Sequence, residues 1–333
     1  MKKYDVLAAG YYGFGNLGDE LLAASVVAQL GAAGVDRRRI ALLSADPAAE
    51  SASQGVDCFN RWRMEEVFSA MRYSRTLLLG GGGLFQDSTS VKSCVYYWGL
   101  VKMARAAGLA AWSAGQSIGP LRSSAASFLA KSAFSSCRFR GVRDSRSLDV
   151  LKSWGMDGWL SQDLATGLRV RKDFAGGRTL LLNLRPGYEK LAAAAASGAA
   201  AYARGKGLKV AGVAFAAEDA AELKKYVDNG VLELVQITVV KNLHDYENIL
   251  DGCCRAVGMR LHFVVLSVLA GLPTAAVAYD PKVASFCSDW NVPLFAAEEP
   301  GFSDPLKTAG LAANAEQNIQ AMFRAGLAAV IGD

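Results

Sequence analysis

The sequence has few of the side chains that bind transition metals. It contains two histidines, His244 and His262, and none of its six cysteines forms a Cys-x-x-Cys pair. Structural zinc sites need about four His or Cys ligands at short spacings, so we expect no metal site. Scattered thiols in a chain of 333 residues are typical of reduced core cysteines. This pattern predicts a cytoplasmic, metal-free protein.

Long apolar runs are also lacking. The most apolar stretch, residues 263–279, is interrupted by Gly271 and Pro273 and falls short of the ~20 residues that a membrane-spanning helix needs. Near the start, residues 6–10 are too short for the apolar core of a signal peptide. We therefore expect at most peripheral contact with the inner face of a membrane.

Neither sign of charge is in large excess. The chain has 36 Lys and Arg against 31 Asp and Glu, a formal net charge of +5 and a pI near 8.8. This balance lacks the strong basic stripes of nucleic-acid-binding proteins, so we expect no nucleic-acid partner. It suits an enzyme that handles anionic substrates or works near an anionic membrane. A hydrophobic content of 52% indicates ordered cores.

Short apolar runs alternate with stretches of helical character along the first half of the chain. The expected strands are 5–9, 39–43, 76–79, 110–114 and 139–142, and the expected helices are 19–30, 92–107, 123–134 and 145–154. Apolar strands separated by helices predict a parallel sheet covered on both faces.

The same pattern restarts in the second half. Strands are expected at 179–183, 208–215, 232–239, 255–259 and 274–278, and the basic, glycine-containing stretch 169–178 is the candidate linker. The length also favours two domains. We predict an α/β protein with two Rossmann-like domains, residues 1–170 and 178–333, facing a cleft. We expect the last helix to pack back on the first domain.

The first predicted strand is followed by a loop with the pattern Gly13-x-Gly15-x-x-Gly18. This is formally a dinucleotide fingerprint, but Asp19 and Glu20 at the helix start would repel a pyrophosphate. Asp19 has two open interpretations: it caps the helix, or it binds a sugar hydroxyl and acts as a base. Ligands bind at the carboxyl ends of strands in such sheets, which favours the second.

Three more loops with unusual residues follow strands of the first half. Gly80–Gly83, followed by Gln86 and Asp87, predicts a loop whose backbone N–H groups approach a ligand closely. The second runs from Gly115 to Pro120. In the third, Asp144 or Ser145 is expected to cap the next helix, and Arg143 to point toward the cleft.

In the second half, Gly258-Met-Arg260-Leu-His262 ends a strand and opens an apolar helix. A helix N-terminus offers free N–H groups, and Arg260 and His262 add donors for phosphate or carboxylate. A lone histidine on an apolar helix is otherwise a core residue. Lys282 follows the next predicted strand, so we expect Arg260, His262 and Lys282 to converge on one anion. His244 is given no role.

These segments together resemble the polysaccharide pyruvyltransferase family, in particular the bacterial enzymes that act on cell-wall polymers anchoring S-layer proteins. The matching segments, in order from residue 5 to about 295, are Gly-Tyr-Tyr-Gly-Phe-Gly-Asn-Leu-Gly-Asp-Glu, Gly-Gly-Gly-Gly-Leu-Phe-Gln-Asp, Gly-Gln-Ser-Ile-Gly-Pro, Val-Arg-Asp, Gly-Met-Arg-Leu-His and Tyr-Asp-Pro-Lys. The resemblance implies a GT-B-like fold and transfer of pyruvate from phosphoenolpyruvate to two hydroxyls of a glycan, which is commonly lipid-linked.

The resemblance also implies residue roles. It places the donor mainly on the second domain, with His262 and Lys282, to which the helix-start pattern above adds Gly258 and Arg260. It also implies an arginine from the first domain, which we assign to Arg143. The expected acceptor-binding residues are Gly15, Asn16, Asp19, Gly82, Gly83 and Gln86. His262 is either the general acid or a phosphate ligand, and Asp19 is the expected base with Asp87 second. No cofactor is expected beyond phosphoenolpyruvate as substrate.

Three other functions remain open at this stage. A GT-B glycosyltransferase with a nucleotide-sugar donor shares the predicted architecture. A nicotinamide-dependent oxidoreductase would use Gly13-x-Gly15-x-x-Gly18, although the expected acidic ribose ligand, Asp46, comes late. A glycan-binding module without catalysis is disfavoured, because cations and carboxylates cluster after strands in both halves.

Overall fold

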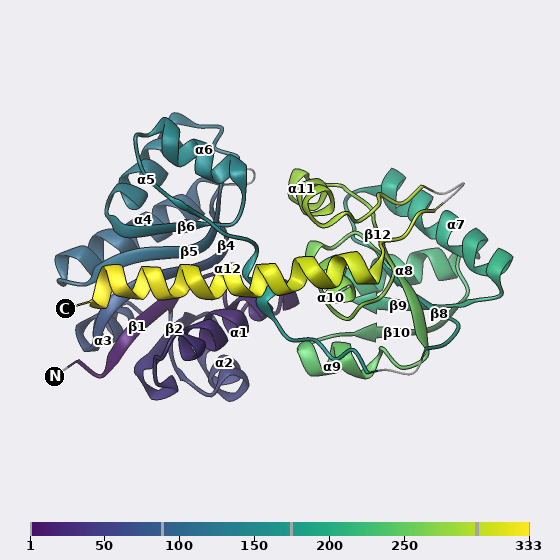
Figure 1. The fold of residues 1–333 in the computed structure, drawn as a ribbon, viewed down its shortest axis with the longest axis horizontal. Helices are drawn as coiled ribbons and strands as arrows, with labels where there is room; N and C mark the ends of the chain where they lie inside the picture. Colours follow the sequence, from purple (N-terminus) through teal and green to yellow (C-terminus); the bar gives the residue numbers. More distant parts are fainter. Residues whose placement is uncertain (1, 88–89, 174–175, 297–299, 333) are drawn as a thin grey trace. The chain divides into compact units, whose positions relative to one another are not determined.

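The computed structural model describes residues 2–87, 90–173, 176–296 and 300–332, and the chain divides into two compact units (Figure 1). The first unit comprises residues 1–14, 19–167 and 315–333, and the second comprises residues 15–18 and 168–314. The main division therefore falls after Gly167, ahead of the predicted linker, of which residues 174–175 lie outside the described part.

A parallel sheet of seven strands forms the first unit, in the order β3-β2-β1-β4-β5-β6-β7. Its strands are β1 (Tyr4–Ala9), β2 (Ile40–Ser44), β3 (Asp57–Asn60), β4 (Ser74–Phe85), β5 (Ala110–Ile118), β6 (Cys137–Val142) and β7 (Trp159–Leu160). Its helices are α1 (Leu17–Ala32), α2 (Pro47–Gln54), α3 (Met64–Tyr73), α4 (Lys92–Ala106), α5 (Ser124–Ser135) and α6 (Ser145–Ser153), with short 3-10 turns at Arg37–Arg39 and Leu164–Gly167.

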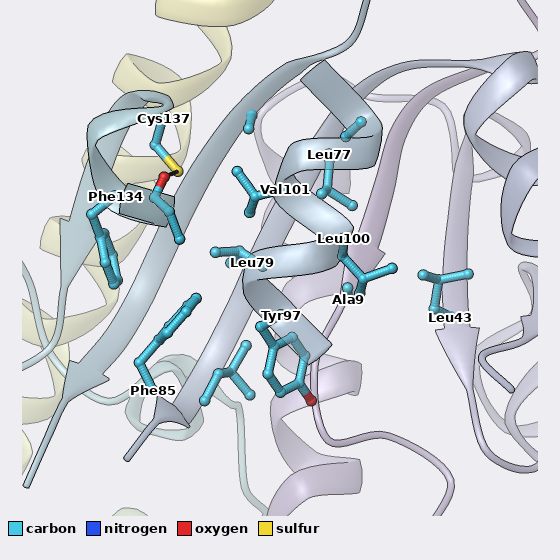
Figure 2. Packing of buried hydrophobic residues seen from close by; sticks show 14 of the residues in the cluster. Ala9, Leu43, Leu77, Leu79, Phe85, Tyr97, Leu100, Val101, Phe134 and Cys137 are labelled. Carbon is cyan, nitrogen blue, oxygen red and sulfur yellow. Dashed lines mark hydrogen bonds between the residues drawn. The ribbon is translucent and has the colours of Figure 1, made fainter. Parts of the chain in front are cut away.

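One face of this sheet packs against α3, α4 and α5. Side chains alternate between the two faces of a strand, so Leu77 and Leu79 of β4 point to the same face, where Leu100 and Val101 of α4 meet them (Figure 2). Phe134 of α5 and Val67 of α3 belong to the same buried cluster. The three helices therefore share one core on this face of the sheet.

The second unit has a parallel sheet of five strands, in the order β10-β9-β8-β11-β12. Its strands are β8 (Thr179–Asn183), β9 (Lys209–Ala214), β10 (Leu234–Val239), β11 (Cys253–Gly258) and β12 (Thr274–Ala276). Its helices are α7 (Glu189–Lys206), α8 (Ala217–Asp228), α9 (Leu243–Asn248), α10 (Leu261–Leu269) and α11 (Pro281–Trp290).

The last helix, α12 (Pro305–Ile331), begins in the second unit, and residues 315–331 group with the first. Phe323 packs edge-on against Trp112 of β5, with ring centroids 6.0 Å apart. Gly326 lies so close to Trp112 that an added Cβ would be 2.5 Å from the indole ring. This aromatic contact ties the end of the chain to the centre of the first sheet.

The predicted fold class is confirmed, but two glycine-containing segments that were expected to be loops are not. Gly115–Ile118 of the expected loop 115–120 belongs to strand β5. Gly80–Gly83 was expected to form a loop, but it continues strand β4, and Gly82 pairs with Gln116 of β5. Gly81 and Gly82 have φ angles of 74° and 80°, which only glycine adopts readily. The segments β3, β7, α2 and α3 were not predicted. The strands β3 and β7 are too short for their alternation to be visible, whereas α3 buries Val67, Ala70 and Met71 at helical spacing, a signal that could have identified it.

No helix in the described residues is both long and apolar enough to span a membrane. All six cysteines are free, and Cys94, Cys137, Cys253 and Cys287 are buried. Burial raises the pKa of the Cys253 and Cys287 thiols to about 12. These two thiols are therefore protonated at neutral pH and poorly nucleophilic.

The contact of Phe323 with Trp112 leads to a stability prediction. Phe323 is fully buried, so Phe323→Ala should leave a cavity and lower the free energy of unfolding by about 3–5 kcal/mol. Leu306, in the first turn of the same helix, is 86% exposed, so Leu306→Ala should change it by less than about 0.5 kcal/mol. Urea denaturation measures both values, and equal midpoints would contradict the proposed anchor.

Candidate functional site

The loop after β1 is held by its own aromatic side chain. Tyr12 is buried, and its hydroxyl donates a hydrogen bond to the Gly80 carbonyl. A Cβ on Gly10 would lie 2.3 Å from the Tyr12 ring, and a Cβ on Gly80 would lie 2.6 Å from its hydroxyl. Both glycines are therefore needed to seat Tyr12, which brings the first loop against β4.

The dinucleotide-like glycines have a packing role as well. A Cβ on Gly13 would lie 2.1 Å from Ser44 Oγ and 2.5 Å from the backbone nitrogen of Asp46. The Gly13 N–H donates to the Glu20 carboxylate at 3.1 Å. Glu20 thus places a negative charge in the first turn of α1. In dinucleotide-binding folds, the pyrophosphate binds at this helix N-terminus.

The side chain of Arg61 holds the loop after β1 in place. This buried guanidinium donates to the Gly10 carbonyl at 2.7 Å and to the Tyr97 hydroxyl at 3.1 Å. The rings of Phe14 and Tyr96 lie 5.1 and 4.5 Å from its central carbon, within the range of cation–π attraction. Sequence reasoning missed Arg61, because it follows the short strand β3 that apolar periodicity does not reveal.

Asp19 lies beside the glycine-rich end of β4. A Cβ on Gly82 would be 3.9 Å from Asp19 Oδ1, so the two residues predicted to bind the acceptor are neighbours within the first unit. Gln116 of β5 donates its amide to the Gly81 carbonyl at 2.7 Å. Gly83 and Gly15 are both exposed, and no atom lies within 4 Å of a Cβ added at either glycine. Gln86 ends this segment and is half-buried.

A buried pair of carboxyl groups lies next to the first loop. Glu50 of α2 is buried, and its side chain hydrogen-bonds to Glu20. Burial, followed by the hydrogen bond and the charge of Glu20, raises the pKa of Glu50 to about 8. Glu50 is therefore mostly protonated at neutral pH and shares its proton with the carboxylate that holds Gly13.

The loops after β4 and β6 use their acidic residues for structure. Asp87 accepts hydrogen bonds from the backbone nitrogens of Arg122 and Ser123 at 2.7 and 2.8 Å, which hold the turn before α5. The Arg122 backbone hydrogen bond, first among several, lowers the pKa of Asp87 and weakens it as a base. Asp144 caps α6 by accepting from the Ser147 backbone nitrogen, one of the roles expected for this segment.

Arg143 is bound inside the first unit. Its Nη1 atom lies 2.5 Å from Asp163 Oδ2, and both side chains are at least 90% buried. Asp163 also accepts from the backbone nitrogen of Ala165. This pair fixes the Arg143 guanidinium at the end of β6. A guanidinium has five N–H donors, so Arg143 retains donors for another ligand.

In the second unit, Arg260 bridges two loops at the carboxyl edge of the sheet. It caps α10 after β11, and its guanidinium donates to Asp219 at 2.6 Å and to Glu218 at 3.1 Å, both at the start of α8. Asp219 is fully buried. Two carboxylates therefore compensate the charge of Arg260, and this residue orders the edge of the sheet.

Arg185 is a second cation at this edge, and sequence reasoning missed it. It follows β8, the strand next to β11, and donates to the Tyr279 hydroxyl at 2.6 Å. Burial raises the pKa of Tyr279, so its hydroxyl is neutral. No carboxylate within the described residues forms an ion pair with Arg185. A charged residue directly after a buried strand was the signal that could have identified it.

His262 lies in the first turn of α10, beside the segment of the first loop that groups with the second unit. A Cβ on Gly18 would be 2.0 Å from His262 Nδ1, so only glycine leaves room for the imidazole. Asn16 accepts from the Gly18 backbone nitrogen at 3.3 Å, and Leu17 donates to the Phe215 carbonyl at 3.5 Å. Within the second unit, the structure therefore brings residues 16–18 of the first motif and His262 together.

Gly258 and Lys282 complete the predicted donor set. A Cβ on Gly258 would lie 2.1 Å from the Phe263 ring, so this glycine makes room for the side chain that directly follows its motif. Lys282 lies in the first turn of α11, which follows β12, and its ammonium is 4.0 Å from Asp280. Within the described residues, no group of three His, Cys, Asp or Glu side chains is arranged to hold a metal ion.

Comparison with known proteins identifies the family of the chain. The family model described as polysaccharide pyruvyl transferase matches residues 16–281, most of the chain. The chain belongs to the polysaccharide pyruvyl transferase family, and it is therefore a transferase. A sequence search of curated proteins finds no match.

Solved structures show the same fold. The UDP-GlcNAc 2-epimerase of Methanocaldococcus jannaschii matches with a TM-score of 0.58 at 7% identity, over 93% of this chain and 92% of the epimerase. The UDP-GlcNAc 2-epimerase of Neisseria meningitidis, bound to UDP-GlcNAc, matches with a TM-score of 0.54 at 8% identity, over 98% of each chain. These proteins share the GT-B-like architecture of two parallel α/β units.

The Glu20–Glu50 pair predicts how stability depends on pH. The pKa of Glu50 is about 8 in the folded protein and near 4.5 in a model peptide, so the folded protein holds an extra proton between these values. Stability should then fall as the pH rises through this window, by at most about 1.4 kcal/mol per pH unit. Glu50→Gln should remove this slope, because an amide donates to Glu20 without titrating.

Urea denaturation at pH 5, 6.5 and 8 measures this dependence. Glu65→Gln serves as the control, because Glu65 is exposed on α3 and its loss should leave the slope unchanged. Parallel stability curves for the Glu50→Gln variant and the unmodified protein would exclude the shared proton.

Proposed function

We propose that the protein transfers pyruvate from phosphoenolpyruvate to two hydroxyls of one sugar in a cell-wall or surface polysaccharide, forming a cyclic ketal and releasing phosphate. The family match over residues 16–281 carries this proposal. We further propose that the acceptor is a lipid-linked precursor, as for polymers that anchor S-layers. The reaction then takes place in the cytoplasm at the inner face of the membrane, with no cofactor.

The charges of the second unit suit such a donor. Phosphoenolpyruvate carries roughly three negative charges when its phosphate is fully ionised. Arg185, His262 and Lys282 follow three neighbouring strands, β8, β11 and β12, at the carboxyl edge of one sheet. The N-terminus of α10 adds backbone N–H groups at the same edge. In this proposal Arg260 orients the loop, and Arg143 of the first unit is a further donor ligand.

The acceptor site is proposed at Gly15, Asn16, Asp19, Gly82, Gly83 and Gln86 of the first two motifs. The neighbouring positions of Asp19 and Gly82 support it. A carboxylate beside an open glycine backbone can accept a hydrogen bond from a sugar hydroxyl and remove its proton. Asp19 is therefore preferred as the base over Asp87, whose oxygens hold a turn.

The chemistry has two addition steps. A proton adds to the methylene carbon of phosphoenolpyruvate while the first sugar hydroxyl bonds to C2 and loses its proton to the base. The C2–O bond to phosphate then breaks, and the second hydroxyl bonds to C2 and releases its proton. We assign the first proton donation to His262, because an imidazole can donate a proton and this one lies in the first turn of α10, at the edge of the second sheet where the donor is proposed to bind.

The role of His262 can be tested by phosphate release. In the presence of a lipid-linked disaccharide acceptor, the protein should release phosphate from phosphoenolpyruvate, and mass spectrometry should detect one added pyruvyl ketal. His262→Ala should lower kcat by about 10²–10⁴-fold. His244→Ala, in α9, is the matched control and should retain full turnover. Near-normal kcat of His262→Ala at saturating donor would exclude the acid role.

The same assay tests the space at Gly18. Gly18→Ala should displace the His262 ring and lower kcat by at least about tenfold, since misplacing a reacting group by 1 Å costs up to ~10²-fold. Gly31 lies in the same helix, α1, with no atom within 4 Å of an added Cβ. Gly31→Ala should therefore leave kcat unchanged. Equal kcat for both variants would contradict the proposed position of His262.

The same assays separate this function from its alternatives. A nucleotide-sugar donor, as expected for a GT-B glycosyltransferase, would yield a nucleoside diphosphate and no phosphate from phosphoenolpyruvate. The placement of Glu20 at the start of α1 disfavours a nicotinamide cofactor. Raised thermal stability in the presence of NAD would reverse that conclusion.

A further inference from the structure

The outer side of the helices α3, α4 and α5 is unusually apolar. Trp62, directly before α3, is 60% exposed, Phe68 of α3 is 54% exposed and Phe128 of α5 is 67% exposed. The exposed large apolar residues of this region are Trp62, Met64, Phe68, Tyr73, Val91, Val95 and Phe128. By contrast, no large apolar side chain is exposed in the described residues of α1 and α2.

These side chains lie on one continuous surface. The inner sides of α3, α4 and α5 contribute to a single buried cluster on one face of the sheet, so their outer sides face the same way. Trp98 of α4 donates to Ser132 of α5 at 3.2 Å, and Trp62 contacts Tyr96 of α4 with ring centroids 5.7 Å apart. We call this surface the α3–α5 face.

Cations surround the apolar residues on the α3–α5 face. Between residues 61 and 135, in the described part, seven basic side chains are exposed and Glu65 is the one exposed acidic side chain. The basic residues are Arg63, Arg72, Arg75, Lys92, Arg105, Arg122 and Lys131. Arg63 and Arg75 contact Glu66 and Asp5 at 3.4 and 3.6 Å. The remaining cations give the face a net positive charge.

We propose that the α3–α5 face docks on an anionic lipid bilayer. Exposed Trp, Phe and Val side chains enter the headgroup boundary, where aromatic rings are favoured, and the Lys and Arg side chains pair with lipid phosphates. A second copy of this chain would place cations against cations, which disfavours self-association through this face. Charge complementarity therefore selects an anionic surface as the occupant.

The position of the α3–α5 face also fits the proposed reaction. Trp62 contacts Phe14 of the first loop edge-on, with ring centroids 6.2 Å apart, and Val91 and Lys92 follow the carboxyl end of β4. The face thus reaches the edge of the first sheet that carries Asp19 and Gly82. Resting on the proposed function, this places a membrane-anchored acceptor beside the residues that would bind its sugar.

Vesicle binding tests the proposal without requiring turnover. The full-length protein should sediment with vesicles of phosphatidylcholine and phosphatidylglycerol, and weakly or not at all with phosphatidylcholine alone. The triple variant Lys92→Gln, Arg122→Gln, Lys131→Gln should bind anionic vesicles more weakly, by about fivefold per charge removed. The triple variant Phe68→Ser, Val95→Ser, Phe128→Ser should lose binding at high salt, where the apolar contribution dominates.

Two matched control variants remove three charged or three apolar side chains from helices and strands of the second unit. Lys190→Gln, Lys206→Gln, Lys224→Gln removes three exposed charges, and Leu191→Ser, Val235→Ser, Leu306→Ser removes three exposed apolar side chains. Both controls should bind as the unmodified protein does. Phosphate release with a short soluble acceptor should be unchanged in all four variants, which shows that each remains folded and separates this proposal from the function itself.

Three results would overturn the proposal. The first is sedimentation that does not depend on phosphatidylglycerol. The second is equal loss of binding in the face variants and their controls. The third is a change of oligomeric state in the Phe68, Val95, Phe128 variant, measured by analytical ultracentrifugation, without a change in vesicle binding. That last result would assign the face to a second copy of the chain.

Discussion

Each strand of the two sheets shares backbone hydrogen bonds with neighbours that run in the same direction. Parallel pairing requires a crossover after every strand, so all loops after strands collect at one edge of each sheet. The acidic and glycine-rich motifs lie at this edge of the first unit, and Arg185, Arg260 and His262 lie at this edge of the second. Without the parallel ladders these residues would be far apart.

Close packing then decides how the motif residues are used. The glycines at positions 80, 258 and 18 each leave space that a neighbouring side chain fills, namely Tyr12, Phe263 and His262. A Cβ at any of these positions would come within 3 Å of that neighbour. The glycine-rich motifs therefore position aromatic and imidazole rings. In the first unit, the loop after β1 is also held by Arg61 and by the Glu20–Glu50 pair.

Charge is distributed differently in the two units. In the second unit, Arg260 is ion-paired with Asp219 and Glu218, while Arg185 is hydrogen-bonded to a neutral tyrosine, so within the described residues the Arg185 guanidinium has no carboxylate partner at the edge of that sheet. In the first unit, carboxylates lie at the carboxyl edge, and cations cover the outer side of α3, α4 and α5. An anionic donor on the second unit and a hydroxylic acceptor on the first are consistent with this distribution.

The sequence by itself determined the parallel α/β class and most long strands, because an apolar run followed by a helical repeat is visible locally. It also determined the family, through six motifs in order. Short strands such as β3 were not predictable, and neither was Arg61 that follows β3. Tertiary structure alone decided that Gly80–Gly83 continues a strand, that Arg260 is paired with carboxylates and that His262 lies beside Gly18. These outcomes depend on contacts between residues distant in sequence, for which no local pattern exists.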